Sequence, residues 1–131
     1  MRLQNWQSRL DAYVRSARHR EYKIGEFDCC IACADVVQAV TGKDPMSDLR
    51  GSYNTEIGAY RLISRLGGME AILSSRLGPS IPVLSACAGD IGIGGDDGRS
   101  AVFCIGPGWA TVTDSGFTAV LPPVMAWRSH G

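Results

Sequence analysis

The sequence predicts an α+β fold in which the helices come first and an antiparallel sheet follows. Before Pro79 the apolar residues recur at helical spacings of three and four, and after it they form short alternating runs separated by Gly, Pro and Asp. Because helices and strands are segregated, a doubly wound fold is excluded. The 131 residues, 45% of them hydrophobic, contain no linker or internal repeat, so we expect a single domain over residues 1–131 with one shared core.

Two helices are expected in the first third of the chain. Residues 5–20 carry apolar side chains at every third or fourth position and arginines on the other faces, which predicts an amphipathic helix. Asp28 is a good N-cap for a second helix over residues 29–40, which Gly42 and Pro45 would end. That second helix is apolar nearly all round, so we expect it at the centre of the fold.

Two shorter helices follow a loop over residues 43–53. Asn54 is in a position to cap a helix at residues 55–65, and the fourth helix is expected at residues 69–77, between two glycines. The sheet or small barrel that comes next would use five strands. They are expected at residues 90–93, 100–105, 109–113, 116–120 and 124–128.

The glycine-rich segment at residues 92–98 superficially resembles a phosphate-binding loop. Its glycines are at the wrong offsets for a dinucleotide fingerprint and no helix follows it. A hairpin turn between the first two strands is the better interpretation. The Asp96–Asp97 pair in this turn could attract a cation, but nothing completes a calcium-binding loop.

Composition excludes several classes of function. Thirteen basic and thirteen acidic residues balance, and no basic stripe is present, so no nucleic-acid partner is expected. No apolar run approaches the roughly 20 residues that span a bilayer, so no membrane span is expected. The N-terminal residues lack the features of a secretion signal, which indicates a protein made and kept in a cytoplasm. Five cysteines, three of them crowded at residues 29–33, favour reduced thiols.

The sharpest local feature is Cys29, directly after the Asp28 cap. Unpaired backbone N–H groups and the positive end of the helix dipole favour a thiolate at this position, as in cysteine nucleophiles. The Asp28 carboxylate beside the thiol opposes this effect and raises the pKa of the thiol. A buried structural cysteine is the competing interpretation.

A family resemblance rests on this cysteine and on several short motifs. An Asp-Cys pair opening the central helix, followed by a Gly89-Asp90 strand, resembles the NlpC-type, papain-like cell-wall cysteine peptidases. The set resembles more closely a family of small tailed-phage tail proteins related to those peptidases. The signatures span residues 22–128 and are Phe27-Asp28-Cys29-Cys30, Ala34-Asp35, Thr41-Gly42-Lys43-Asp44-Pro45, Arg50-Gly51-Ser52-Tyr53, Gly89-Asp90 and Ala126-Trp127-Arg128.

The resemblance implies a fold in which the N-terminal helices, with Cys29 at the start of the central one, pack on the C-terminal antiparallel sheet. In the active peptidases it also implies a histidine base at the start of the strand after the Gly-Asp strand. Ser100 occupies that position here. The chain's two histidines are His19, on the first helix, and His130, one residue from the end. His19 could serve as a base only by approaching Cys29 from a helix, and surface solvation is the competing interpretation.

Metal binding is a separate hypothesis for the cysteines. Cys30 and Cys33 form a C-x-x-C motif, and Cys87 and Cys104 could add ligands from the strand half. No second C-x-x-C motif exists, and the first lies on an apolar helix, so no metal or other cofactor is expected.

These observations predict a degenerate NlpC-like domain that serves as a structural and assembly component of a phage tail tip. Cys29 would hold the nucleophile position without activity, and the partners would be the hub, distal tail and central-fibre proteins. The protein would reside in the host cytoplasm during assembly and then in the virion tail. The first alternative is a cysteine peptidase or amidase that contacts and cleaves peptidoglycan, and the second is a metal or iron–sulfur interaction module.

Overall fold

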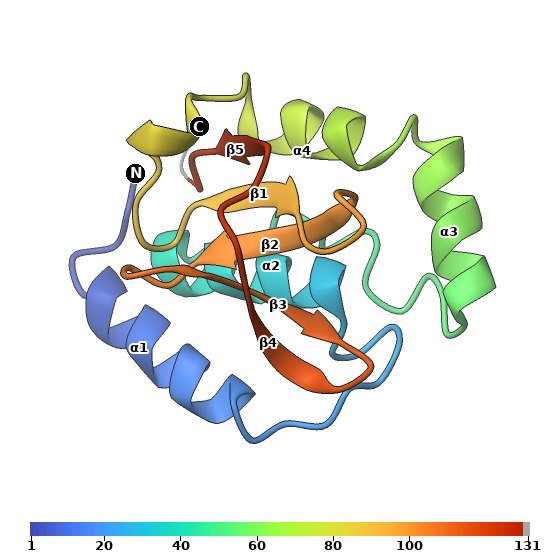
Figure 1. Ribbon diagram of the computed structural model, residues 1–131, viewed down its shortest axis with the longest axis horizontal. Coiled ribbons are helices and arrows are strands. Elements are labelled where there is room, and N and C mark those ends of the chain that lie inside the picture. Colours follow the sequence, from blue (N-terminus) through green and yellow to red (C-terminus); the bar gives the residue numbers. More distant parts are fainter. Residues whose placement is uncertain (130–131) are drawn as a thin grey trace.

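The computed structural model describes residues 1–129. Four α-helices precede an open antiparallel sheet with the strand order β4-β3-β2-β1-β5, so the α+β prediction is confirmed (Figure 1). The elements are α1 (Trp6–Ala17), α2 (Cys29–Thr41), α3 (Glu56–Arg65), α4 (Met69–Leu77), a 3-10 helix η1 (Val83–Ser85), β1 (Ile91–Gly94), β2 (Ser100–Cys104), β3 (Trp109–Thr113), β4 (Gly116–Val120) and β5 (Met125–Trp127).

Helix α2 is the centre of the fold, as its apolar sequence predicts. Eight of its thirteen residues are buried, between α1 on one side and strands β2 and β3 on the other. Asp28 caps its start by accepting a hydrogen bond from the Ile31 backbone N–H, at 2.9 Å. Gly42 ends it in the left-handed conformation, with φ at +79°. Both ends of α2 are therefore fixed by residues that the sequence points to.

Strands β1 to β3 bury residues on both faces of the sheet, with alternate residues on each. One face joins the core that also contains residues of α1, α2 and α4, so the helical and strand halves share a core as expected. The other face is covered by the segment around η1, and Val120 of β4 packs beside Trp109 on it. The first face includes Ile91, Ile93, Ala101, Phe103, Ala110 and Val112, and the second is built on Val102, Cys104, Trp109 and Ala126.

The glycines of β1 are required by a close crossing of two chain segments. The connection from β4 to β5 passes over this strand, and Val124 N donates to Ile93 O at 2.9 Å. A Cβ atom on Gly92 would lie 2.7 Å from Pro123 Cγ, and one on Gly94 would lie 2.9 Å from Pro123 Cα. The hairpin interpretation of the glycine-rich run is confirmed, since β1 and β2 pair directly across it.

Two helix ends differ from the sequence expectation. Helix α1 ends at Ala17, three residues early, because the next residues form a turn. Helix α3 is capped by Thr55, whose hydroxyl accepts from Gly58 N at 2.9 Å, so the Asn54 assignment is wrong by one residue.

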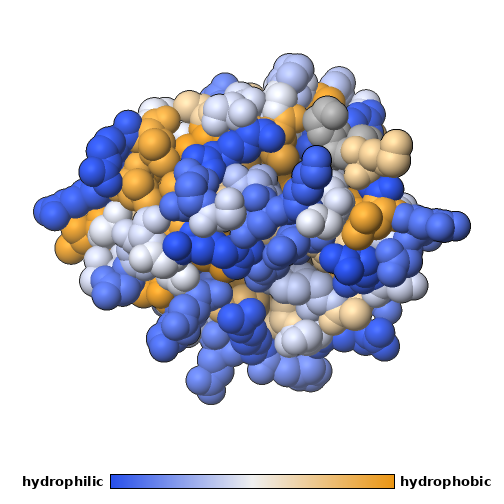
Figure 2. Space-filling model, turned by 180° about the vertical axis from the view of Figure 1, so that it is seen from behind, coloured by the Kyte–Doolittle hydropathy of each residue, from blue (hydrophilic) through white to orange (hydrophobic). Residues whose placement is uncertain are grey.

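Helix α3 is the least buried helix of the four. Ala59 is its one buried residue, whereas Ile57 and Tyr60 are 66% and 68% exposed. Apolar side chains interrupt the polar surface on the side where α3 lies (Figure 2). None of the helices described is long and apolar enough to cross a membrane.

Candidate functional site

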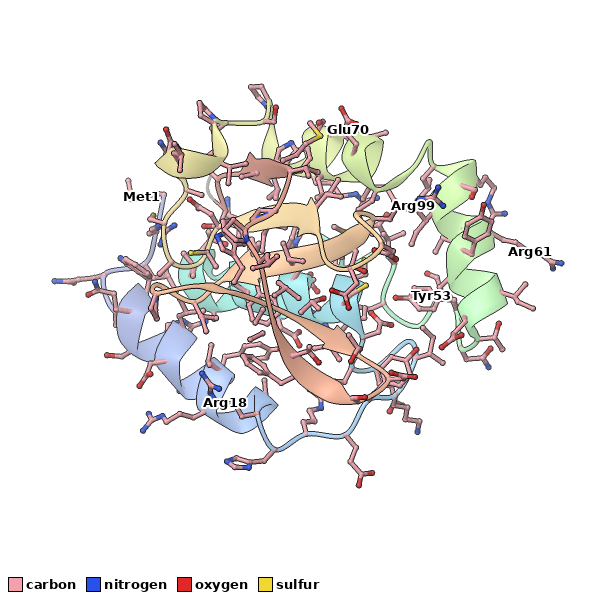
Figure 3. All side chains as sticks on the ribbon, viewed as in Figure 1. Met1, Arg18, Tyr53, Arg61, Glu70 and Arg99 are labelled. Carbon is pink, nitrogen blue, oxygen red and sulfur yellow. The ribbon has the colours of Figure 1, made fainter. Side chains whose placement is uncertain are left out.

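The start of α2 is held by Asp28, which is 3% exposed. Besides capping the helix, its carboxylate accepts hydrogen bonds from Gly25 N at 2.7 Å and from the Tyr53 hydroxyl at 2.9 Å. Gly25 has φ at +84°, and a Cβ atom there would lie 2.4 Å from Tyr53 O, so only glycine fits. Burial and the nearby Asp28 charge raise the pKa of Tyr53, which keeps its hydroxyl a donor. Tyr53 lies on the segment ahead of α3 (Figure 3).

The Cys29 thiol lies against the start of β2. Its sulfur accepts hydrogen bonds from the backbone N–H groups of Ala101 and Cys30, which lower its pKa. Burial and the adjacent Asp28 carboxylate act in the opposite direction and prevail, so the pKa of Cys29 rises to about 11. The thiol is therefore protonated at neutral pH. The sequence predicts both the groups that lower and the group that raises the thiol pKa. The burial that makes the increase prevail is known only from the structure.

Ser100 precedes Ala101 in β2, but its side chain points away from Cys29. Its hydroxyl donates to Asp97 Oδ1 at 3.1 Å, in the β1–β2 turn. Asp97 also accepts from the backbone N–H groups of Arg99 and Ser100, at 2.9 and 3.2 Å, and these bonds lower its pKa. Because side chains alternate along a strand, Ser100 and the α2-facing Ala101 lie on opposite sides of β2. Neither residue offers a base to Cys29.

The surface next to Ser100 is a small depression of about 230 Å³. Thr111, Thr113 and Thr118 of strands β3 and β4 line it together with the turn. Cys29 is not part of this lining. The serine position and the cysteine therefore open onto different surfaces.

No histidine of the described residues is among the groups with the largest effects on the Cys29 thiol. The groups with the largest effect on its thiol are Asp28, Ala101, Cys30 and Asp97. His19 follows α1 as an exposed residue, in agreement with surface solvation. His130 lies outside the described residues.

All five cysteines are free, as expected from their crowding. Burial raises the pKa of Cys30 to about 12 and also holds that of Cys33 well above its ordinary value. Cys87 is exposed on the segment before β1, and Cys104 is buried at the end of β2. In residues 1–129 no three His, Cys, Asp or Glu side chains form a group that could hold a metal ion. The metal hypothesis thus has no ligand set in this part of the chain.

The segment between α2 and α3 is held by charged residues from three of the sequence signatures. Arg50 donates through Nη2 to Asp35 Oδ1 and through Nε to Asp44 Oδ2, both at 2.5 Å. The Tyr13 hydroxyl completes the cluster by donating to Asp35 at 2.9 Å. These residues position the segment that carries Tyr53 and so support the start of α2.

Asp90 of the Gly-Asp signature is a second buried carboxylate, with 0% exposure. It accepts hydrogen bonds from Arg2 Nη2 at 2.9 Å, from Cys87 N at 2.9 Å and from Ser129 N at 3.1 Å. The sequence gives no sign of the Arg2 pairing, because 88 positions separate the partners. Asp90 therefore joins both ends of the described chain to the sheet.

The fold and the site define a class of small α+β domain with a protonated cysteine at the start of its buried central helix. Residues 1–129 match the family described as a domain of unknown function, DUF6950, and the chain belongs to that family. No curated protein and no solved structure matches the chain.

Proposed function

We propose that this domain is a structural and assembly component of a phage tail tip, built on a papain-like, NlpC-type scaffold that has lost its catalytic base. Its partners would be the hub, distal tail and central-fibre proteins. The tail assignment rests on the set of short motifs that resembles small phage tail proteins. The loss of catalysis rests on the surroundings of Cys29.

The arrangement of elements supports the scaffold. Cys29 opens a buried helix that packs under an antiparallel sheet, and its sulfur contacts the strand that follows the Gly89-Asp90 strand. This is the order of elements that the NlpC resemblance implies. The motifs also contribute to the structure, since Asp28 and Asp90 each accept three hydrogen bonds. Those from Tyr53, Arg2 and Ser129 come from distant parts of the chain.

The main support for a non-catalytic role is that the Cys29 thiol is protonated. With a pKa near 11, about one molecule in 10⁴ carries the thiolate at pH 7. A working cysteine nucleophile instead has its pKa lowered by a neighbouring cation or an adjacent base. Here Asp28 and Asp97 are the charged neighbours with the largest effects, and both raise the pKa of the thiol.

The exposed face of α3 supports a role in protein contacts. Ile57 and Tyr60 project one turn apart from a helix that buries a single residue. Leu66, just beyond the helix, is 39% exposed. Large apolar side chains grouped on a surface are typical of protein interaction sites.

The test is to analyse purified tails of the phage that encodes the chain and to compare two substitutions. We expect the protein in the tails by mass spectrometry and an unchanged infectious titre for Cys29→Ala. Ile57→Glu should reduce tail assembly, because it places a charge on the proposed contact face. Cys87→Ala, at an exposed cysteine away from α2, is the matched control. Absence from the tails, or loss of infection by a folded Cys29→Ala protein, would contradict the proposal.

A peptidoglycan-cleaving cysteine peptidase or amidase is the second candidate. It is favoured by the two backbone N–H groups that donate to the Cys29 sulfur, since such donors also stabilise a thiolate. A partner chain would then have to supply the histidine. Release of muropeptides by the wild-type assembled tail, and not by the Cys29→Ala tail, would establish this candidate in place of the first.

A further inference from the structure

A cavity of about 600 Å³ lies at the opposite end of α2 from Cys29. The N-terminal segment, the last turn of α2, residues 43–45, the end of α4 and Ser129 converge on it. Met1, which lines it, is on the far side of the molecule from Arg61 of α3 (Figure 3). This cavity shares no lining residue with the surroundings of Cys29.

Two polar atoms in the wall of this cavity have unused hydrogen-bonding capacity. Arg76 Nε and Ser129 Oγ are buried and have no hydrogen-bond partner in the described part of the chain. The rest of the Arg76 guanidinium is held in place, since Nη1 donates to Pro45 O at 2.9 Å and to the Asp48 carboxylate. Arg76 Nε can only donate, so it calls for an acceptor. An unmet buried donor is unfavourable, and two beside one cavity indicate a missing partner.

The charge that remains available at this cavity is positive. Lys43 is exposed and forms no ion pair among the residues described. Asp44 also lines the cavity, but its carboxylate is bound to Arg50 and to Met46 N. The C-terminus of α4 adds partial negative charge, which Arg76 in its last turn offsets.

The Thr41–Pro45 segment, one of the sequence signatures, holds Lys43 at the cavity. The Thr41 hydroxyl donates to Val37 O at 2.8 Å and accepts from Lys43 N at 3.2 Å. Gly42 supplies the left-handed turn between them. The backbone of Lys43 is thereby fixed while its side chain reaches solvent.

We propose that this cavity binds a small organic anion through its carboxylate or phosphate group. The anion accepts hydrogen bonds from Lys43 Nζ and from Ser129 Oγ, the latter after the serine hydroxyl turns into the cavity, while Arg76 stays bound to Pro45 O and Asp48 in the wall beside it. The apolar part of the ligand packs on Leu3, Val37 and Leu77, which also line the cavity. The volume is in the range of small-molecule sites, about 300–1,000 Å³, and exceeds that of a bare phosphate.

The test uses inorganic phosphate and succinate as separate probes, with sodium chloride at equal ionic strength as the reference. We expect one probe or both to cause saturable NMR shifts in the backbone amides of residues 41–44, 46, 77 and 129. A stronger response to phosphate or to succinate identifies the preferred oxyanion. Shifts no larger than those in sodium chloride, or shifts confined to other residues, overturn the proposal.

The sequence contains two lysines, Lys23 and Lys43, which provide a matched pair of variants. Lys43→Gln should weaken binding about tenfold, as expected for loss of a charged hydrogen-bond donor, and Lys23→Gln less than about twofold. Ser129→Ala should weaken it about threefold without a change in charge. Equal losses for the two lysine variants would reduce the effect to net charge and overturn the site. Unfolding midpoints equal to wild type confirm that the exposed lysine variants are folded.

Discussion

The two ends of helix α2 differ in how completely their polar groups are satisfied. At the N-terminal end, Asp28 meets three donors and the Cys29 thiol is protonated and held by backbone N–H groups. At the C-terminal end, a cavity keeps unmet donors on Arg76 and Ser129. The family resemblance implies catalysis at Cys29, yet the polar groups at that end of α2 already have hydrogen-bond partners. Spare binding capacity lies at the other end.

Asp28 and Asp90 are the two buried carboxylates of the described residues, and replacing each in turn tests what it holds together. Replacing Asp90 with alanine should have the largest effect, because it removes the ion pair that the buried carboxylate forms with the Arg2 guanidinium, which is 12% exposed. We expect a loss of about 3–5 kcal/mol in the free energy of unfolding, measured by urea denaturation. Asp11→Ala, in an exposed pair with Arg15, is the control and should change stability by less than about 0.5 kcal/mol. Similar losses for both variants would contradict a structural role for Asp90.

At the N-terminal end of α2, Asp28→Ala should lower the free energy of unfolding by about 2–4 kcal/mol, because it removes the helix cap and the acceptor of the Tyr53 hydroxyl. Asp28→Asn keeps one acceptor oxygen for the cap and should lose less. Hydrogen exchange of the first-turn amides of α2 would locate the effect. If Asp28→Ala leaves those amides protected, the carboxylate does not hold this end of the helix.

The pH dependence of the free energy of unfolding tests whether the buried thiols are protonated in the folded protein. Cys29 and Cys30 have folded-state pKa values raised to about 11 and about 12, above the ordinary value of 9.0. The stability they contribute is therefore complete below about pH 9 and is lost as the pH rises through the folded values, since only the unfolded chain releases these protons easily. Urea denaturation at pH 7 to 10.5 should show a plateau and then a decline. The decline should be shallower in Cys29→Ala, and an identical decline would contradict the assignment.

The smallest effect is expected for Ser100→Ala. Its hydroxyl bonds to Asp97 at an exposed turn, so the free energy of unfolding should change by no more than about 0.5 kcal/mol. The rate of Cys29 alkylation should not change either, because the serine faces away from the thiol. A changed alkylation rate would show that Ser100 belongs to the cysteine site after all.

Local sequence signals predict the local structure well. The Asp28 cap and Gly42 stop bound α2, and the bounds of β3 and β4 agree with those expected from turn residues. The misplaced cap at Asn54 arose because Thr55 beside it is an equally good acceptor.

The features that could not be predicted from the sequence are contacts between distant residues and the directions of side chains. The Arg2–Asp90 pair joins residues 88 positions apart, and no local pattern marks it. The direction of Ser100 follows from alternation only once the inward face of β2 is known. The unmet donors of Arg76 and Ser129 come together through tertiary packing, so their residue types alone give no signal.

The central claim, a cysteine in the nucleophile position that is not activated, is tested most directly by the pH–rate profile of Cys29 alkylation. Iodoacetamide should be used on a Cys87→Ser background, because Cys87 is the exposed thiol. We predict a rate that still rises above pH 9, with an apparent pKa near 11, and that is at least about a hundredfold below that of an unperturbed thiol at pH 7. A plateau with an apparent pKa below 7 would contradict this claim and indicate a working nucleophile.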